Sequence, residues 1–540
     1  MIALLEKLSA KKALFMIVLL FIPLFMFYLS RPGLWDEDES VYAEISRQMV
    51  SRHDYVGTYF NYEPRYDKPP LNFWINTFFY KLFGMTEFSS RLGSTLFSFL
   101  GLILMYSFGK RLFNKRVGIM AALMIGTAFL YFVETQMALI DTTLTFMIGL
   151  ILYLFYLGVI ENRSNLLIWM GMPLGLGILA KGPVALILSG GVGLIFWLFL
   201  KLKSQTNWRS LFNWQLLAGF AVAAAICLPW YWAMWSRYGM DFISSHFGYH
   251  MIDRFTKPLE GHGGEWYFSL YYLIMLFIGF MPWSAYIPGS VTLAVKRWSE
   301  PNMFFLLSWA AITFAFFTVA QTKLPGYTLP LFPPVALLMG YWWDQLLTVP
   351  GMRSNPWWGI AIQLLIVTGF VVLIVVFRSY LPQGYENAIW VLFLLPASLI
   401  AGAIAIIILR RRDRSYEPFF KVTFFTFYLF WALFLMLLVP IIENFKPVKY
   451  LAVDLRGHLT DKDRVVSYIP SNYTAPFYTR HKVDFVHNDQ DFKRIYTLKT
   501  RVYAFVSADG LKYLWEQRIP CYQLSHFGSG YLISNQAVNW

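Results

Sequence analysis

Long apolar runs separated by short polar loops dominate this chain. A membrane-spanning helix needs about 20 apolar residues, and about thirteen stretches of the sequence approach that length. They lie near residues 13–30, 92–109, 117–133, 142–160, 166–180, 183–200, 215–235, 267–292, 303–320, 327–345, 357–377, 388–409 and 420–441. The pattern predicts a polytopic α-helical membrane protein with about thirteen transmembrane helices.

Two regions between the runs are longer than turns. The first covers residues 31–91, where apolar positions at helical spacing in 38–52 and 71–83 predict two amphipathic helices. We expect both to lie at the membrane interface with their apolar faces toward lipid. The second region is a predicted loop at 236–265. Both belong to a transmembrane domain at 1–442.

The composition changes near residue 443. Two segments, 464–469 and 501–506, have the β-branched and aromatic content of strands, and the stretch 508–517 between turns has a polar helical pattern. Residues 443–540 are therefore predicted to form a small α/β domain.

Composition and charge narrow the class and orient the chain. The sequence is 57% hydrophobic and 14% charged, which excludes an ordinary soluble enzyme. The net charge is +14, and most basic residues fall in short loops that share one face if the thirteen spans alternate. By the positive-inside rule this face is cytoplasmic. The N-terminus is then cytoplasmic, and the C-terminal domain lies on the outer side of the membrane.

The polar residues of interest gather on the opposite, outer face. A secondary transporter keeps its coupling charges near the bilayer midplane, whereas none of these residues needs to lie there. The arrangement favours a reaction at the outer membrane–water boundary on a substrate with a lipid tail. The residues are Asp38, Glu39, Asp67, Lys68, Asp141, Lys181, Arg254, His262 and Lys323.

The acids have ordinary structural interpretations as well as catalytic ones. Asp38 and Glu39 begin a predicted helix, where carboxylates stabilise the N-terminus. However, the four acids at 36–39 exceed what capping requires, and one of them can act as a general base. Asp141 precedes an apolar run, either as a helix cap or as a second carboxylate facing the same cavity.

The basic residues also have two interpretations. Lys68, Lys181 and Lys323 can be snorkelling lysines, or they can contact a phosphate as point charges. Asp67 is placed to orient Lys68, and Arg254 can make a forked phosphate contact. His262 lies in a glycine-rich stretch, where a histidine is usually only a solvated side chain.

Several short motifs together resemble the bacterial protein-mannosyltransferase-like superfamily, and within it most closely the lipid A aminoarabinose transferases. The resemblance runs in order from about residue 12 to 440. The motifs are Asp38-Glu39-Ser40-Val41-Tyr42-Ala43-Glu44-Ile45, Lys68-Pro69-Pro70, Ala180-Lys181-Gly182, His262-Gly263-Gly264 with Trp266-Tyr267, Pro282-Trp283, and Lys323-Leu324-Pro325 with Tyr327.

The resemblance implies a GT-C fold and a polyprenyl-phosphate-linked sugar donor used on the periplasmic side. It maps the catalytic acid onto Asp38, the carrier-phosphate lysine onto Lys68 and a second acid onto Asp141. The motif residues Tyr42, His262 and Tyr327 join the expected donor-binding set of Asp67, Lys68, Lys181, Arg254 and Lys323. One departure is Val41, where these transferases often carry arginine.

The sequence therefore predicts an inverting glycosyltransferase that moves a sugar from undecaprenyl phosphate to lipid A. A protein O-mannosyltransferase-like enzyme with a protein or other glycan acceptor is the alternative. A flippase for lipid-linked sugars, or a non-catalytic scaffold, represents the other classes. No metal-ligand spacing is visible, so no cofactor is expected to be required, although a divalent cation is compatible with a phosphate acceptor. No nucleic-acid partner is expected.

Overall fold

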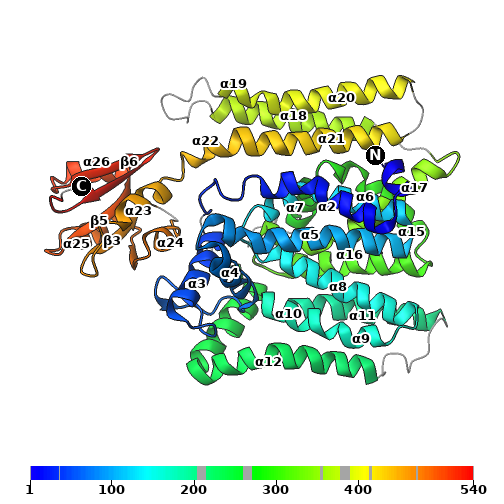
Figure 1. Ribbon diagram of the computed structural model, residues 1–540, viewed down its shortest axis with the longest axis horizontal. Helices are drawn as coiled ribbons and strands as arrows, with labels where there is room; N and C mark the ends of the chain where they lie inside the picture. Colours follow the sequence, from blue (N-terminus) through cyan, green and yellow to red (C-terminus); the bar gives the residue numbers. More distant parts are fainter. Residues whose placement is uncertain are drawn as a thin grey trace.

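The computed structural model describes residues 2–35, 37–203, 214–258, 270–352, 357–377, 389–412, 416–469, 472–538 and 540. Helices form a bundle, and a small sheet lies beyond one end of it (Figure 1). All thirteen predicted apolar runs fall on helices, because each run satisfies its backbone hydrogen bonds internally, as a lipid environment requires.

Within these described residues, eight helical stretches are long and apolar enough to cross a membrane. Five are single helices: α5 (Glu87–Leu112), α8 (Asp141–Ile160), α11 (Val184–Leu202), α16 (Pro301–Val319) and α18 (Trp357–Phe377). The other three combine consecutive helices: α12 (Trp214–Ile243) with η2 (Ser244–Asp253) and α13 (Arg254–Thr256), α19 (Ile389–Leu392) with α20 (Leu394–Arg412), and α21 (Glu417–Leu433) with η7 (Phe434–Leu438) and α22 (Val439–Glu443).

Two sharply bent helix pairs are also long and apolar enough, and the number is ten if each pair counts as one span. One joins α6 (Lys115–Thr127) to α7 (Phe129–Thr135) at 67°, and the other joins α14 (Tyr271–Gly279) to η4 (Trp283–Tyr286) and α15 (Ile287–Lys296) at 113°. The predicted count of thirteen is not confirmed. The other three runs form shorter helices: α2 (Ala10–Met26), α9 (Asn165–Trp169) with α10 (Gly171–Lys181), and α17 (Phe332–Thr348).

The two helices predicted in the first outer region are confirmed as α3 (Asp38–Arg52) and α4 (Leu71–Phe83). Helix α4 keeps the expected apolar surface, with Phe78 and Leu82 each 58% exposed. Helix α3 differs from the prediction, because every residue from Glu39 to Met49 is buried. The C-terminal domain and α4 cover the face that was expected to meet water.

The predicted second outer loop is largely helical. Its described part from residue 236 to Thr256 continues α12 through η2, a π-helix, into α13. Gly239 has non-helical backbone angles, with φ 57°, so two helical segments meet there at a kink. The buried aromatic groups of Phe242 and His246 explain why the segment stays folded against the bundle.

The C-terminal region contains the predicted sheet. Strands β3 (Arg464–Tyr468) and β5 (Val502–Ser507) match the two predicted strands, and α26 (Ala508–Glu516) matches the predicted helix. The sheet has the order β4-β3-β5-β7-β6, in which β3 pairs in parallel with its two neighbours and β7 pairs antiparallel with its own. The remaining elements here are α23 (Val448–Arg456), α24 (Ala475–Thr479), β4 (Val483–Phe485), α25 (Asp489–Tyr496), β6 (Tyr522–Phe527) and β7 (Gly530–Ser534).

A hairpin between α3 and α4 connects this domain to the bundle. It consists of β1 (Tyr59–Phe60) and β2 (Glu63–Pro64), and both turn residues, Asn61 and Tyr62, have positive φ. Such a two-residue turn suits asparagine at its first position. The Asn61 side-chain amide donates to the Val483 carbonyl at 2.7 Å, and its oxygen accepts from the Val483 N–H at 2.9 Å. The hairpin is thereby fixed to strand β4 just before the chain reaches Asp67 and Lys68.

Candidate functional site

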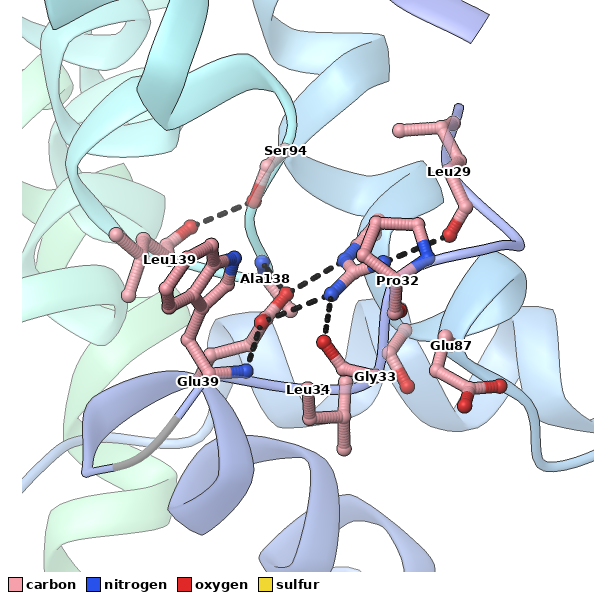
Figure 2. Close-up of polar contacts among 12 residues, drawn as sticks. Leu29, Pro32, Gly33, Leu34, Glu39, Glu87, Ser94, Ala138 and Leu139 are labelled. Atoms are coloured by element: carbon pink, nitrogen blue, oxygen red, sulfur yellow. Dashed lines mark hydrogen bonds and ion pairs between the residues drawn. The ribbon is translucent and has the colours of Figure 1, made fainter. Parts of the chain in front are cut away.

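The start of α3 is held by a buried ion pair between Glu39 and Arg91 (Figure 2). Both side chains are fully inaccessible to solvent, and the Arg91 Nε–Glu39 Oε1 distance is 2.7 Å. The other four N–H groups of Arg91 reach Glu39 Oε2 and the carbonyls of Leu29, Pro32 and Gly33. Every donor of the guanidinium therefore has an acceptor.

Glu39 is also saturated as an acceptor. It accepts from the backbone N–H of Trp35 at 2.7 Å and from that of Ala138 at 2.8 Å. Burial by itself would raise the pKa of Glu39, but Arg91 lowers it below the usual range for a carboxyl group. Glu39 was predicted to be catalytic. The structure instead places it where it ties α3 to α5 and to the turn that precedes Asp141.

A mostly apolar cavity of about 340 Å³ lies beside this junction. It is formed where the ends of several helices meet, and its volume falls within the range of small-molecule sites. Its polar and charged lining consists of Asp67, Lys68, Lys181, His250, Arg254, Thr256, Thr322 and Tyr327. Five of these residues were predicted from the sequence: Asp67, Lys68, Lys181, Arg254 and Tyr327.

Lys68 supplies a cation that the described residues leave without an ion-pair partner. Its neighbour Asp67 is buried and pairs instead with Arg65, at 3.1 Å from Nε to Oδ2. Burial would raise the pKa of Asp67, but Arg65 and then Lys68 lower it well below its usual range. Asp67 therefore stays ionised beside Lys68, and the lysine can face an anion from the cavity.

A second polar group, built on Lys181, completes the cavity wall. The Lys181 ammonium lies 2.5 Å from Asp141 Oδ1 and 4.2 Å from the centre of the Tyr327 ring. These contacts join the end of α10, the start of α8 and the short helix η5 (Pro325–Leu331). Asp141 is thus a paired carboxylate behind the wall of the cavity.

The remaining predicted residues lie outside the cavity lining. Asp38 is exposed at the first turn of α3, and its charge reaches the site: the pKa of Arg65 is raised chiefly by Asp67, and Asp38 adds to the shift. Tyr42 is buried against Phe73 at a ring distance of 5.8 Å. His262 lies outside the described residues.

Lys323 was predicted to bind the donor, but it occupies a structural position. It is 5% exposed, and its ammonium donates to the carbonyls of Phe317 at 3.0 Å and Thr318 at 2.6 Å. These are unpaired carbonyls at the end of α16, which a cation commonly satisfies. A lysine followed by proline thus looks alike in sequence whether it faces a cavity or caps a helix.

Two further groups at the site were missed in the sequence. His250 lines the apolar cavity and also a wider polar hollow formed with Arg65, Tyr66 and Asp241. The signal for it was the spacing of His246, His250 and Arg254, which repeats every four residues in an apolar helix. Glu134, at the end of α7, is buried near Asp141; a lone acid at the end of an apolar run is a functional signal by itself.

In the part of the chain that the structure describes, three or more His, Cys, Asp or Glu side chains nowhere converge as a metal site. The chemistry that the site offers is electrostatic: apolar walls suit a lipid chain, and Lys68, Lys181 and Arg254 suit a phosphate. Acids border this cation-rich cavity at Asp38, Asp67 and Asp141.

Comparison with solved structures decides the fold. The chain superimposes on the crystal structure of ArnT from Cupriavidus metallidurans bound to undecaprenyl phosphate with a TM-score of 0.81 and 22% identity, over 98% of this chain and 99% of that one. The chain has the GT-C fold of that structure. This result confirms the predicted fold.

Sequence comparisons agree with the structural one. The family described as dolichyl-phosphate-mannose-protein mannosyltransferase matches residues 67–233 of this GT-C chain. The undecaprenyl phosphate-α-4-amino-4-deoxy-L-arabinose arabinosyl transferase 2 of Proteus mirabilis is 28% identical over 72% of the chain and 70% of that protein. The corresponding transferase of Pseudomonas paraeruginosa is 33% identical over 60% of the chain and 58% of its own length.

Proposed function

We propose that the chain is a membrane glycosyltransferase that moves 4-amino-4-deoxy-L-arabinose from undecaprenyl phosphate to lipid A. The observation that carries the proposal is Lys68, a cation without an ion-pair partner among the described residues, at an apolar cavity. Such a cavity accepts a lipid chain whose terminal phosphate meets the ammonium. The relatives act on this donor by name, and the fold matches a protein solved with undecaprenyl phosphate.

In this reaction the bond between the anomeric carbon and the carrier phosphate breaks. The electron pair leaves with the phosphate oxygen, and Lys68 stabilises the negative charge that develops there, assisted by Arg254. The low-polarity walls strengthen this interaction, as at other preorganised sites. An acceptor oxygen forms the new bond from the opposite face of the sugar, so a single displacement inverts the configuration.

Asp38 is assigned to the acceptor side. A hydroxyl acceptor requires a base, whereas a phosphate monoester has a second pKa of about 6 and is already anionic near neutral pH. With lipid A as acceptor, Asp38 therefore does not need to remove a proton. Because its carboxylate would repel an anionic phosphate, Asp38 orients the acceptor through a shared cation such as Arg65, whose charge it stabilises. We propose that the transfer needs no bound metal, which predicts full activity in the presence of EDTA.

The orientation of the chain follows from the same proposal. Helix α3 and the C-terminal domain lie at one end of the bundle, opposite the N-terminus (Figure 1). The cavity belongs to this end, because it is lined by Asp67 and Lys68 from the segment between α3 and α4. We place this end in the periplasm and the N-terminus in the cytoplasm of a bacterial inner membrane. Labelling of single cysteines with a membrane-impermeant maleimide tests the placement, since a cysteine in residues 443–540 should react in intact spheroplasts.

The deciding experiment uses purified full-length protein in lipid nanodiscs with undecaprenyl phosphate-linked 4-amino-4-deoxy-L-arabinose and lipid A. We expect mass spectrometry to show lipid A with one added aminopentose and free undecaprenyl phosphate as co-product. Asp38→Asn should abolish the product while the protein remains folded. If no lipid A product forms, the proposed acceptor is wrong.

Two other arms separate the alternatives. The matched mannosyltransferase family model makes a protein acceptor the second candidate, so a serine- and threonine-rich peptide with undecaprenyl phosphate-mannose is tested in parallel. Glycosylation of the peptide alone would favour that candidate. Movement of labelled donor between leaflets without any covalent product would favour a flippase.

A further inference from the structure

The C-terminal end of α3 meets the C-terminal domain at a seam where arginines gather around Tyr62. This tyrosine lies at the tip of the β1-β2 hairpin. The guanidinium carbons of Arg47 and Arg52 each lie 5.7 Å from the centre of its ring. Its hydroxyl donates to the Arg480 carbonyl at 2.6 Å. One aromatic side chain thus brings together arginines from α3 and from the end of α24.

An acid neutralises Arg47 but not the other two arginines. Arg47 makes a forked ion pair with Glu44, with N–O distances of 2.6 Å and 2.7 Å, and both side chains are buried. Arg52 and Arg480 are exposed, and neither forms an ion pair within the described residues. The seam therefore carries positive charge that the described acids do not balance.

Arg456 adds to this charge from a third helix. It is exposed, has no ion-pair partner in the described part of the chain, and ends α23, which packs against α24 through Leu455 and Phe477. Burial lowers the pKa of Arg480, and the charges of Arg456 and Arg47 lower it further. Arg456 and Arg480 therefore lie close enough to repel each other. Arg52, Arg456 and Arg480 are referred to below as the seam arginines.

Helix ends explain only part of this arrangement. Each seam arginine lies at the C-terminal end of a helix, where a cation is favourable. This accounts for one cation on each helix, but holding like charges near one another still costs free energy. A bound anion would remove that cost. Guanidinium groups suit carboxylates and phosphates in particular, because they can donate two parallel N–H bonds.

The seam lies within reach of the proposed reaction site. Arg65, which lines the polar hollow beside the cavity, follows Tyr62 by three residues along the hairpin. At the rise of a β-strand this separation is about 10 Å. A glycolipid headgroup bound at the hollow can therefore extend its outer sugars along the hairpin to the seam arginines.

We propose that the seam arginines bind carboxylate or phosphate groups on the outer sugars of the acceptor glycolipid and so increase its affinity. This inference rests on the proposed function. It gives the acceptor a second, acidic part beyond the phosphate that receives the aminopentose. The seam arginines touch no reacting group, so they act on acceptor binding and not on the chemical step.

The test compares two acceptors with the full-length protein in phosphatidylcholine nanodiscs. One is lipid A, and the other is lipid A extended by two 3-deoxy-octulosonic acid residues, each of which bears a carboxylate. The wild type should have a KM at least tenfold lower for the extended acceptor, with similar kcat. The double variant Arg456→Gln with Arg480→Gln should raise this KM to that of lipid A and leave kcat unchanged. Equal KM values in the wild type, or a double variant that keeps the preference, would overturn the inference.

Arg518→Gln is the matched control. Arg518 is also exposed, has a positive φ like Arg480 (54° against 57°), and forms no ion pair among the described residues. It follows α26, which packs on the face of the sheet opposite to α23 and α24. The control should leave both KM values unchanged. The double variant should keep the wild-type Tm; a lower Tm with equal losses for both acceptors would mean a merely structural role and would overturn the inference.

Salt gives a second measurement that needs no variant. Exposed charges are screened as ionic strength rises, so raising NaCl from about 50 to about 500 mM should reduce the preference of the wild type for the extended acceptor. A preference that does not change with salt would overturn the inference, even if the double variant does not fold. Loss of the preference in phosphatidylglycerol nanodiscs would assign the seam arginines to anionic lipid headgroups in general and would overturn it as well.

Failure of the inference can be distinguished from failure of the proposed function. Binding of both acceptors is measured by native mass spectrometry without donor, so it does not depend on transfer. Selective binding of the extended acceptor without any transfer would support the role of the seam arginines and contradict the proposed reaction. Transfer to both acceptors with equal affinity would support the proposed reaction and overturn the inference.

Discussion

Asp38 and Glu39 are adjacent acids, yet they lie in opposite surroundings. Glu39 is inaccessible and has a partner for each oxygen, in a junction where Arg91 also uses all of its donors (Figure 2). Asp38 is exposed, and the nearby cavity contains polar groups without partners among the described residues, such as the Lys68 ammonium and Asp67 Oδ1.

This difference separates the groups that hold the site together from those that can act in it. A fully hydrogen-bonded buried network rigidifies its surroundings, and the Glu39–Arg91 junction fixes both α3 and the turn before Asp141. A group without a protein partner has capacity for a ligand. The same pattern of acids in sequence thus contains one positioning residue and one candidate for catalysis.

The largest effect is expected from removing the cation of the junction. Arg91→Met would leave Glu39 buried without its charge partner, and breaking a buried ion pair costs about 3–5 kcal/mol. We expect thermal unfolding in detergent to show a lower Tm and a matching loss of transfer activity. Arg91→Lys should recover little, since a single ammonium cannot replace the five directed N–H groups of arginine.

The double variant Glu39→Leu with Arg91→Met serves as the control for this interpretation. It removes both charges, so it should be more stable than Arg91→Met alone. If both have equal Tm values, the Glu39 charge is not what destabilises the single variant, and the junction is less important for positioning than the geometry indicates.

The cavity should respond in the opposite way, with lost activity and intact folding. Lys68→Ala removes the charge proposed to stabilise the leaving phosphate, and loss of one such contact typically costs about 10²–10³ in rate. We expect kcat to fall by that factor. The free energy of unfolding should stay within about 0.5 kcal/mol of the wild-type value, so Tm should change little. A control is Lys421→Ala, which removes an ammonium that pairs with Glu417 away from the cavity.

A large stability change in Lys68→Ala would contradict the comparison, because it would make Lys68 part of the supporting structure. Unchanged kcat would remove Lys68 from the reaction. Measurement of both quantities on one preparation separates the two outcomes.

The sequence predicted the fold through patterns that local physics controls. The lengths of apolar runs identified the helical bundle, and the content of β-branched and aromatic residues identified β3 and β5. The residues 38–52 and 71–83 were predicted as helices with the bounds that α3 and α4 have. Partners across the fold could not be predicted: nothing local to Arg91 shows that Glu39 lies 2.7 Å away.

At the candidate site, too, the residue types could be predicted from the sequence, but their contacts across the fold could not. Lys68 is followed directly by proline and Lys323 by proline two residues later, but Lys68 lines the cavity and Lys323 binds carbonyls at the end of α16. Which role a lysine takes depends on where the preceding helix ends in space. Glu134 was missed because its significance comes from Gly326 and Asp141, which belong to other elements.

A smaller effect is expected where the C-terminal domain holds the hairpin before Lys68. Asn61→Gly keeps the positive φ available but removes both hydrogen bonds to Val483, each worth about 0.5–1.5 kcal/mol. We expect faster hydrogen exchange in residues 59–64 and 483–485 and a loss of activity smaller than that of Lys68→Ala. Unchanged exchange would show that other contacts hold the hairpin.

The smallest effect is expected at the rim of the same contact, where Lys482 pairs with Glu63 at 2.8 Å. The two side chains are 53% and 70% exposed, and exposed ion pairs contribute about 0.2–1 kcal/mol. Lys482→Ala should therefore change neither Tm nor transfer measurably at physiological salt. A loss as large as that of Asn61→Gly would mean that the ion pair, and not the two hydrogen bonds of the Asn61 amide, fixes the C-terminal domain to the hairpin. In that case, whether a group has all of its hydrogen bonds made would no longer distinguish supporting contacts from the others in this protein.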